Sequence, residues 1–189
     1  MDMSAADGCS VDVRRGGRLV CVAATALALV GAPAGSSSAG ASVYLIDHVA
    51  DGDTVTLTNG ERIRFVQIDT PEVYFGAECY GRQASAITKR LLPPGTSVRL
   101  TIEPATDRID RYGRLLRYVQ RVRDGLNVNV YLVRIGAAAP YFYEDRLGKY
   151  AALLDRLARR ARALHLGLWG ACPGTPYDPD RGVSTGPAP

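Results

Sequence analysis

Two short strings between residues 51 and 72 carry residue types suited to chemistry on a phosphate. The first string reads DGDT and contains Asp51 and Asp53; the second reads RFVQIDTPE and contains Arg64, Asp69 and Glu72. Asp53 and Asp69 can hold a hard cation through carboxylate oxygens, and Glu72 can take a proton from water. Arg64 can bind a phosphate through its forked donors. Together these residues indicate metal-assisted cleavage of a phosphodiester.

Each of these signals is weak when it is taken alone. The DGD string is by itself typical of a polar turn, and the chain lacks the ligand series of an EF-hand. The backbone carbonyl of Thr70 can add a ligand to a cation held by the aspartates, with Asp51 in a supporting position behind them. The two histidines, His48 and His165, are isolated in sequence and predict no zinc site.

Three β-rich runs must position these residues. They cover residues 43–49, 54–58 and 63–68, and each contains alternating or β-branched apolar side chains. Asn59-Gly60 separates the second run from the third, and this dipeptide is the strongest short-range signal for a hairpin. The sequence therefore predicts that the two strings lie on neighbouring antiparallel strands.

The register of this hairpin decides which side chains can meet. Strict pairing around a two-residue turn puts Val55 opposite Arg64 and Asp53 opposite Val66, so that Asp53 and Arg64 share a face. Asp69 lies five residues after Arg64, so on a regular strand its side chain would point to the opposite face. We therefore expect the strand to bend where the chain leaves the ladder, at Asp69-Thr70-Pro71.

The remainder of the chain predicts helices among short strands. Helical spacing marks residues 80–92 and 145–166, and alternation marks strands at 98–102 and 115–122. Residues 126–135 fit either a strand by alternation or a helix ended by a glycine. Five short strands with inserted and appended helices predict an α+β fold built on a small barrel of the OB kind.

The N-terminal segment has the pattern of a secretory signal peptide. Arginines at positions 14, 15 and 18 precede an apolar run over residues 19–34, and small residues continue to Ala41. The run is shorter than the ~20 residues that span a bilayer, so cleavage is favoured over a retained membrane anchor. We expect residues 1–41 to be a signal peptide and the protein to be secreted or extracytoplasmic.

Export would leave two cysteines, Cys79 and Cys172, because Cys9 and Cys21 lie in the signal. In an oxidising compartment these two are candidates for one disulfide, which we favour over two free buried thiols. Beyond Cys172 the residues are mostly Pro, Gly, Asp, Ser and Thr, so we expect residues 173–189 to be disordered. Residues 42–172 then form the single folded domain.

The composition of the 189-residue chain agrees with this organisation. A hydrophobic fraction of 47% and a charged fraction of 22% are ordinary for a globular protein. The net charge of +4 permits a nucleic-acid partner without demonstrating one.

In combination, the motifs resemble the staphylococcal nuclease (thermonuclease-like) family. The resemblance rests on DGDT, on Arg64 followed after four residues by Asp-Thr-Pro-Glu, and on the DRYGR string at 110–114. Further matches are YGRQASA at 80–86, LVRIG at 132–136 and YFY at 141–143. They occur in order, with similar spacing, over about residues 43–169, and ordered motifs are far more specific than any one of them.

The resemblance implies a calcium site and a general base. Asp53, Asp69 and the carbonyl of Thr70 match the family's calcium ligands, with Asp51 beside them. Glu72 matches the carboxylate that is usually assigned as the general base.

The resemblance also implies how substrate is bound. Arg64 and Arg114 match the two phosphate-binding catalytic arginines. The positions that match residues near the bound nucleotide are Arg111, Tyr112, Tyr141 and Tyr143.

The implied fold is a five-stranded OB-type barrel with three helices, and the implied helices include residues 126–135. The implied activity is calcium-dependent hydrolysis of DNA and RNA with little sequence preference, at the bond to the 5′ oxygen. The implied partner is therefore nucleic acid as substrate; we expect no stable protein partner and a monomer. Two features differ from the founding nuclease: the stretch from Glu72 to Tyr80 is shorter and lacks its lysines, and the Cys79 and Cys172 pair is absent there.

Two alternatives belong to other classes of function. Repeats of this fold in Tudor-containing nucleases have lost catalytic residues, so the chain can be a non-catalytic nucleic-acid-binding module of the cell envelope. An envelope-anchored adhesion protein would instead keep its N-terminal segment. Because all the matched carboxylates and arginines are present, the enzyme is the favoured hypothesis.

Overall fold

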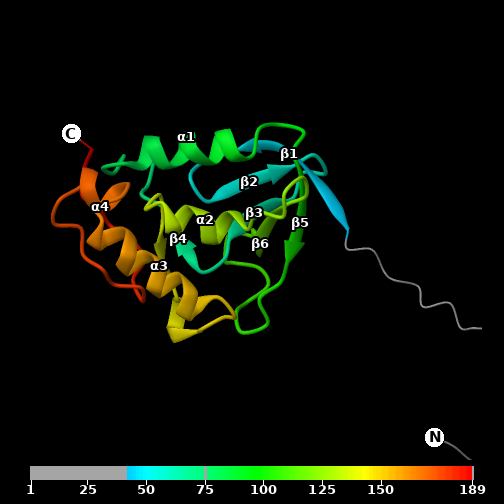
Figure 1. The fold of residues 1–189 in the computed structure, drawn as a ribbon. Helices are drawn as coiled ribbons and strands as arrows, with labels where there is room; N and C mark the ends of the chain where they lie inside the picture. Colours follow the sequence, from blue (N-terminus) through cyan, green and yellow to red (C-terminus); the bar gives the residue numbers. More distant parts are fainter. Residues whose placement is uncertain (1–41, 75, 189) are drawn as a thin grey trace, which may run out of the picture. The chain divides into compact units, whose positions relative to one another are not determined.

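Five strands close into a barrel in the computed structural model, which describes residues 42–74 and 76–188 (Figure 1). The predictions for residues 1–41, including the signal peptide, lie outside the described residues. Around the barrel the order is β1-β2-β3-β6-β5, in which only β3 and β6 run parallel. The strands are β1 (Val43–Val49), β2 (Thr54–Leu57), β3 (Arg62–Phe65), β5 (Ser97–Thr101) and β6 (Leu115–Arg121). The predicted five-stranded barrel is confirmed.

Alternate apolar side chains of these strands fill the barrel interior. Val55, Ile63, Phe65, Val98 and Val119 are completely buried. Burying one such side chain contributes about 1.5–3 kcal/mol, so this interior fixes the strands that carry the site.

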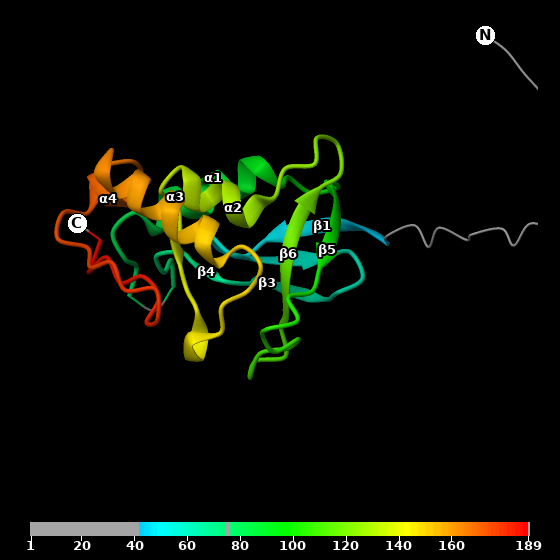
Figure 2. The same cartoon turned by 60° about the horizontal axis from the view of Figure 1, so that its bottom comes forward.

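Three helices pack around the barrel, and a fourth of one turn follows them (Figures 1 and 2). They are α1 (Gly81–Leu91), α2 (Val128–Arg134), α3 (Ala151–Ala163) and the short α4 (Leu168–Ala171). In α2 the side chain of Asn127 caps the first turn by accepting from the amide of Val130, so the helix assigned by resemblance is present. No helix within the described ranges is long and apolar enough to cross a membrane.

The last long helix is shorter than the predicted span of 145–166. Glu144 and Asp145, within the short turn η1 (Tyr143–Asp145), have positive φ angles of 55° and 57°, so the backbone there is not α-helical. The amide of Lys149 then donates to the carboxylate of buried Glu103 at 2.8 Å. The buried carboxylate of Glu103 needs hydrogen-bond donors, and the amide of Lys149 supplies one. The residues before Ala151 therefore stay outside the helix, although their apolar periodicity predicted that they belong to it.

The β2–β3 hairpin has a register one residue away from the predicted one. Val55 pairs with Ile63 and Thr54 with Arg64, whereas we expected Val55 opposite Arg64. The cause is the turn: Gly60 has φ of 86°, and the amide of Leu57 donates to the carbonyl of Glu61 at 2.9 Å. This is a three-residue loop closed by a left-handed glycine, and the extra residue shifts the ladder.

The strand end bends at Gln67, two residues before the predicted position. Gln67 has φ of 63°, and its side chain donates to the carbonyl of Arg146 and accepts from the hydroxyl of Tyr118, both at 2.8 Å. After this bend β4 (Ile68–Asp69) pairs with β7 (Ala139–Pro140). The bend removes the parity conflict, because Asp69 belongs to a different ladder from Arg64.

The segment after Cys172, which we expected to be disordered, lies along the loop that precedes α1. The amide of Cys79 donates to the carbonyl of Gly186 at 2.9 Å, and the amide of Ala188 donates to the carbonyl of Ala77 at 2.8 Å. The predicted disulfide joins Cys79 to Cys172, with their Cα atoms 5.9 Å apart. In Figures 1 and 2 this red segment runs beside α4. Its proline and glycine content does not prevent an extended chain from pairing with a loop.

We predict that removing the disulfide with C79A/C172A lowers the free energy of unfolding by about 4 kcal/mol, because the cross-link closes a long loop in the unfolded chain. The two cysteines are 93 positions apart. Urea unfolding of the oxidised protein and the variant measures the difference. Reductant should lower the wild-type midpoint to that of the variant and leave the variant unchanged; equal midpoints before reduction would contradict the prediction.

Candidate active site

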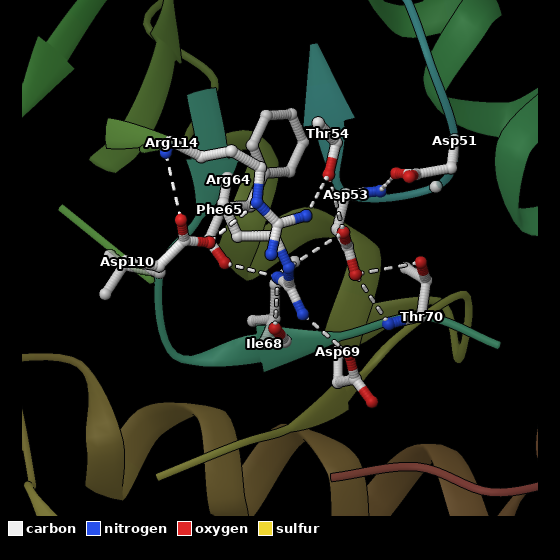
Figure 3. A network of polar contacts seen from close by, with 12 residues as sticks. Asp51, Asp53, Thr54, Arg64, Phe65, Ile68, Asp69, Thr70, Asp110 and Arg114 are labelled. Carbon is white, nitrogen blue, oxygen red and sulfur yellow. Dashed lines mark hydrogen bonds and ion pairs between the residues drawn. The ribbon is translucent and has the colours of Figure 1, made fainter. Parts of the chain in front are cut away.

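The guanidinium of Arg64 lies between the carboxylates of Asp53 and Asp69 (Figure 3). Its Nε is 3.1 Å from Oδ1 of Asp53, and its Nη2 is 2.6 Å from Oδ1 of Asp69. Nη1 donates to the carbonyls of Ile68 and Phe65 at 2.7 and 2.8 Å. With four contacts and a side chain only 12% exposed, Arg64 is held in one orientation.

Asp53 joins the two sequence strings. Its Oδ2 accepts both the amide and the hydroxyl of Thr70 at 2.9 Å, and its own amide donates to Oδ1 of Asp51 at 3.0 Å. Gly52 is needed between the aspartates because a Cβ atom there would lie 2.4 Å from Oγ1 of Thr70. The hydroxyl of Thr88 in α1 donates to the carbonyl of Gly52 at 2.6 Å, which fixes this turn to the helix.

Arg114 reaches the same network through Thr54. Its Nη1 donates to Oγ1 of Thr54 at 3.3 Å, and that hydroxyl donates to Oδ1 of Asp53 at 3.2 Å. The Nε of Arg114 is 2.6 Å from Oδ2 of Asp110. Although burial raises the pKa of Asp110, the hydrogen bonds from Arg114 outweigh it, and the pKa is lowered. The two predicted arginines therefore face one site.

Glu72 lies at the exposed edge of this site. Its amide donates to Oε2 of Glu78 at 3.0 Å, and the amide of Glu78 donates to the carbonyl of Glu72 at 2.9 Å. Partial burial and then the charges of Asp53 and Asp51 raise the pKa of Glu72. Among the described residues no hydrogen bond joins its carboxylate to the Arg64 network, so the group is open to water.

A groove of about 600 Å³ runs beside the two arginines. Figure 2 shows that the loop containing residues 104–114 and the turn at 143–145 project on the same side of the barrel. Tyr112 is 62% exposed and Tyr143 is 55% exposed, so both rings can be reached from solvent. The guanidinium of Arg111 lies 4.8 Å from the centroid of the Tyr112 ring. The predicted site residues that line the groove are Arg64, Arg111, Tyr112, Arg114, Tyr141 and Tyr143.

The site carries more negative than positive charge. The carboxylates of Asp51, Asp53, Asp69 and Glu72 all act on the pKa of Arg64, which they raise against the opposing effect of burial. Burial and then the charge of Asp53 raise the pKa of Asp69 to about 7, although Arg64 opposes them. Burial and then Asp53 raise the pKa of Asp51 as well. In formal charge, the two arginines of the site, Arg64 and Arg114, do not balance these four carboxylates and Asp110.

The residues expected to hold a cation are only partly assembled. Within residues 42–74 and 76–188, no group of three or more His, Cys, Asp or Glu side chains is arranged to hold a metal ion. Asp53 and Asp69 nevertheless offer hard oxygen atoms on two sides of Arg64, in a site with surplus negative charge. This donor set fits a hard divalent cation whose remaining positions go to water and a phosphate.

Two contacts of the site were missed by sequence reasoning. The amide of Val183 donates to Oδ2 of Asp69 at 3.0 Å across 114 positions of sequence, and no local pattern predicts such a pair. Asp110 positions Arg114 from within the same turn, where its carboxylate also accepts the amides of Tyr112 and Arg114.

Comparisons with known proteins agree on the class that this fold and site define. Residues 62–171 match the family described as staphylococcal nuclease homologue. A thermonuclease from Staphylococcus intermedius is 33% identical over 132 residues, which cover 67% of this chain and 75% of the relative. A thermonuclease from Staphylococcus hyicus is 31% identical over 142 residues, covering 72% and 80%. An uncharacterised endonuclease from Escherichia coli O157:H7 is 38% identical over 124 residues, covering 64% and 72%.

The chain belongs to the staphylococcal nuclease family. It is accordingly a nuclease, within the hydrolases. The family match begins at Arg62, after the DGDT string. The bonds from Asp53 to Arg64 and Thr70 attach that string to the matched region.

We predict that the metal-free protein loses stability as pH rises, and that D69N removes part of this loss. An acid with a raised folded-state pKa binds more protons when folded than when unfolded. For Asp69 the window lies between its ordinary pKa of 3.8 and about 7, and stability falls as pH rises through it. We therefore expect the free energy of unfolding in EDTA, measured with urea, to fall from the bottom to the top of this pH window by more in wild type than in D69N. The difference should exceed about 1 kcal/mol.

The matched control is D107N, which replaces an aspartate whose side chain is 59% exposed. Its free energy of unfolding should follow wild type with a constant offset. Parallel curves for wild type and D69N would contradict the assigned environment of Asp69.

Proposed function

We propose that this nuclease is a secreted, calcium-dependent endonuclease that cleaves DNA and RNA with little sequence preference, at the bond to the 5′ oxygen. The observation that carries the proposal is the placement of Arg64 between two carboxylates, with Arg114 linked to the same network. Phosphate binders, hard oxygen ligands and an exposed carboxylate of raised pKa then share one side of the barrel.

Asp53 and Asp69, with the carbonyl of Thr70, are the residues that would hold calcium. When bound, the cation supplies positive charge that polarises the phosphate and favours ionised carboxylates. Arg64 and Arg114 bind the non-bridging phosphate oxygens and stabilise the charge that builds on them.

Glu72 accepts a proton from the attacking water, whose oxygen forms the new bond to phosphorus. The bond from phosphorus to the 5′ oxygen breaks, and that oxygen takes a proton from solvent water and leaves as a hydroxyl, while Glu72 returns its proton to solvent. The raised pKa of Glu72 supports this role, because a base of raised pKa takes the proton more readily.

Broad substrate range is supported by the chemistry of the groove. Its arginines address phosphates, which carry no sequence information, and its exposed tyrosines offer ring faces that stack on any base.

Export is supported by the signal-like N-terminal sequence and by the disulfide, because disulfides persist in oxidising compartments. We expect the mature protein in culture fluid to begin between residues 34 and 42. Peptide mass spectrometry of the fluid measures its N-terminus, and a secreted form that still begins at Met1 would contradict cleavage.

We predict that EDTA, E72Q or R114A lowers digestion of both DNA and RNA by at least about 100-fold, since each removes a group that acts in the transition state. The assay measures initial rates on both substrates with and without calcium. Full activity in EDTA or in E72Q would contradict the proposed mechanism. Binding of oligonucleotides without cleavage by wild type would favour the binding module.

Matched controls are E61Q and R123A. Glu61 is an exposed glutamate of the β2–β3 turn, and the side chain of Arg123 is 68% exposed. Both variants should digest at the wild-type rate, which separates loss of a particular group from a general change of surface charge.

A further inference from the structure

The segment of residues 173–188, here named the C-terminal strap, contacts the site that the preceding proposal assigns to calcium. The amide of Val183 donates to Oδ2 of Asp69 at 3.0 Å. On the opposite oxygen, Nη2 of Arg64 lies 2.6 Å from Oδ1. Asp69 is therefore oriented by two donors, one from the barrel and one from the strap.

This close approach depends on Gly182. The residue has φ of +77°, and a Cβ atom there would lie 2.7 Å from Oδ2 of Asp69 and 3.5 Å from the ring of Tyr141. A side chain at position 182 must therefore displace the strap or the carboxylate, and either movement disturbs the bond from Val183.

The strap also holds the loop that carries Glu72. The hydroxyl of Ser184 donates to Oε1 of Glu78 at 3.1 Å, while Oε2 of Glu78 accepts the amide of Glu72 at 3.0 Å. The hydroxyl of Thr185 donates to the carbonyl of Cys79 at 2.7 Å. Glu78 thus transmits the position of the strap to the backbone of Glu72.

Contacts outside the site fix the course of the strap. The disulfide from Cys172 to Cys79 anchors its beginning. The ring of Tyr177 packs 5.9 Å from that of Trp169, and its hydroxyl donates to Asp155 at 2.6 Å. The carbonyl of Pro179 accepts the amide of Phe142 at 2.7 Å, which places Gly182 and Val183 beside Asp69.

We propose that the C-terminal strap positions Asp69 and Glu72 for catalysis, with Gly182, the amide of Val183 and Glu78 as positioning groups. The inference rests on the proposed calcium-dependent function. The bond from Val183 is compatible with a cation on the same carboxylate, because a carboxylate oxygen has two lone pairs and the amide uses one.

The test compares G182A with G174A in the full chain. Gly174 has a positive φ of +86°, but a Cβ atom there meets nothing within 4 Å, so the control carries similar backbone strain without the clash. For G182A we expect the half-saturating calcium concentration to rise on the order of tenfold, since a hydrogen bond to a charged group is lost. We also expect kcat to fall by a larger factor than KM for DNA rises, because the strap contacts Asp69 and the loop of Glu72 directly and the nucleic-acid groove only through them and the ring of Tyr141.

G174A should keep the wild-type calcium dependence and kcat. Wild-type kinetics for G182A would overturn the proposal, and so would a gain of activity, which would make the strap inhibitory. Equal losses in the two variants would overturn it too, because backbone strain alone would then explain them.

A calcium-free measurement separates this proposal from the proposed function. Amide hydrogen exchange in EDTA, followed by mass spectrometry, should be faster in peptides covering residues 68–80 of G182A than in wild type or G174A. Unchanged exchange would overturn the positioning role whether or not wild type cleaves nucleic acid. If wild type shows no calcium-dependent cleavage but exchange is faster in G182A, the proposed function is contradicted. The contact between the strap and the site is then still supported.

Discussion

The ion pairs of Arg64 with Asp53 and Asp69 are the interaction on which the rest of the site depends. A guanidinium with so little exposure is tolerated only if charged and carbonyl partners surround it, and the barrel supplies them from β3, β4 and the turn before β2. Those segments must take unusual backbone paths to do so. Gly52 is an example: it lies against Thr70 because its neighbour Asp53 bonds to both Thr70 and the Arg64 guanidinium.

The parts of the fold that follow from local pattern could be predicted from sequence. Alternating and β-branched residues such as Val55, Ile63 and Phe65 predicted the strands, and the span of α1 was correct within a residue at each end. The expected proximity of Asp53 and Arg64 on one face is present, although the register behind it was wrong. It survives because Asp53 precedes β2 and reaches Arg64 from a turn, outside the ladder.

The parts that could not be predicted depend on contacts distant in sequence. Lys149 lies outside the expected helix because its amide donates to the carboxylate of Glu103. The backbone bends at Gln67 because Arg146 and Tyr118 are hydrogen-bond partners of its side chain. The position of a polar residue within a strand or helix pattern does not indicate which group, distant in sequence, will be its hydrogen-bond partner. The composition of the strap predicted disorder for the same reason: its stability comes from the loop against which it lies.

The contact between Val183 and Asp69 has a consequence for the order in which the chain is made. The two residues are 114 positions apart, and the strap leaves the ribosome after every strand of the barrel. A nascent chain can therefore complete its barrel while one wall of the site is still missing. Because Cys172, the residue before the strap, is bonded to Cys79, formation of this disulfide ties the start of that wall to the loop before α1.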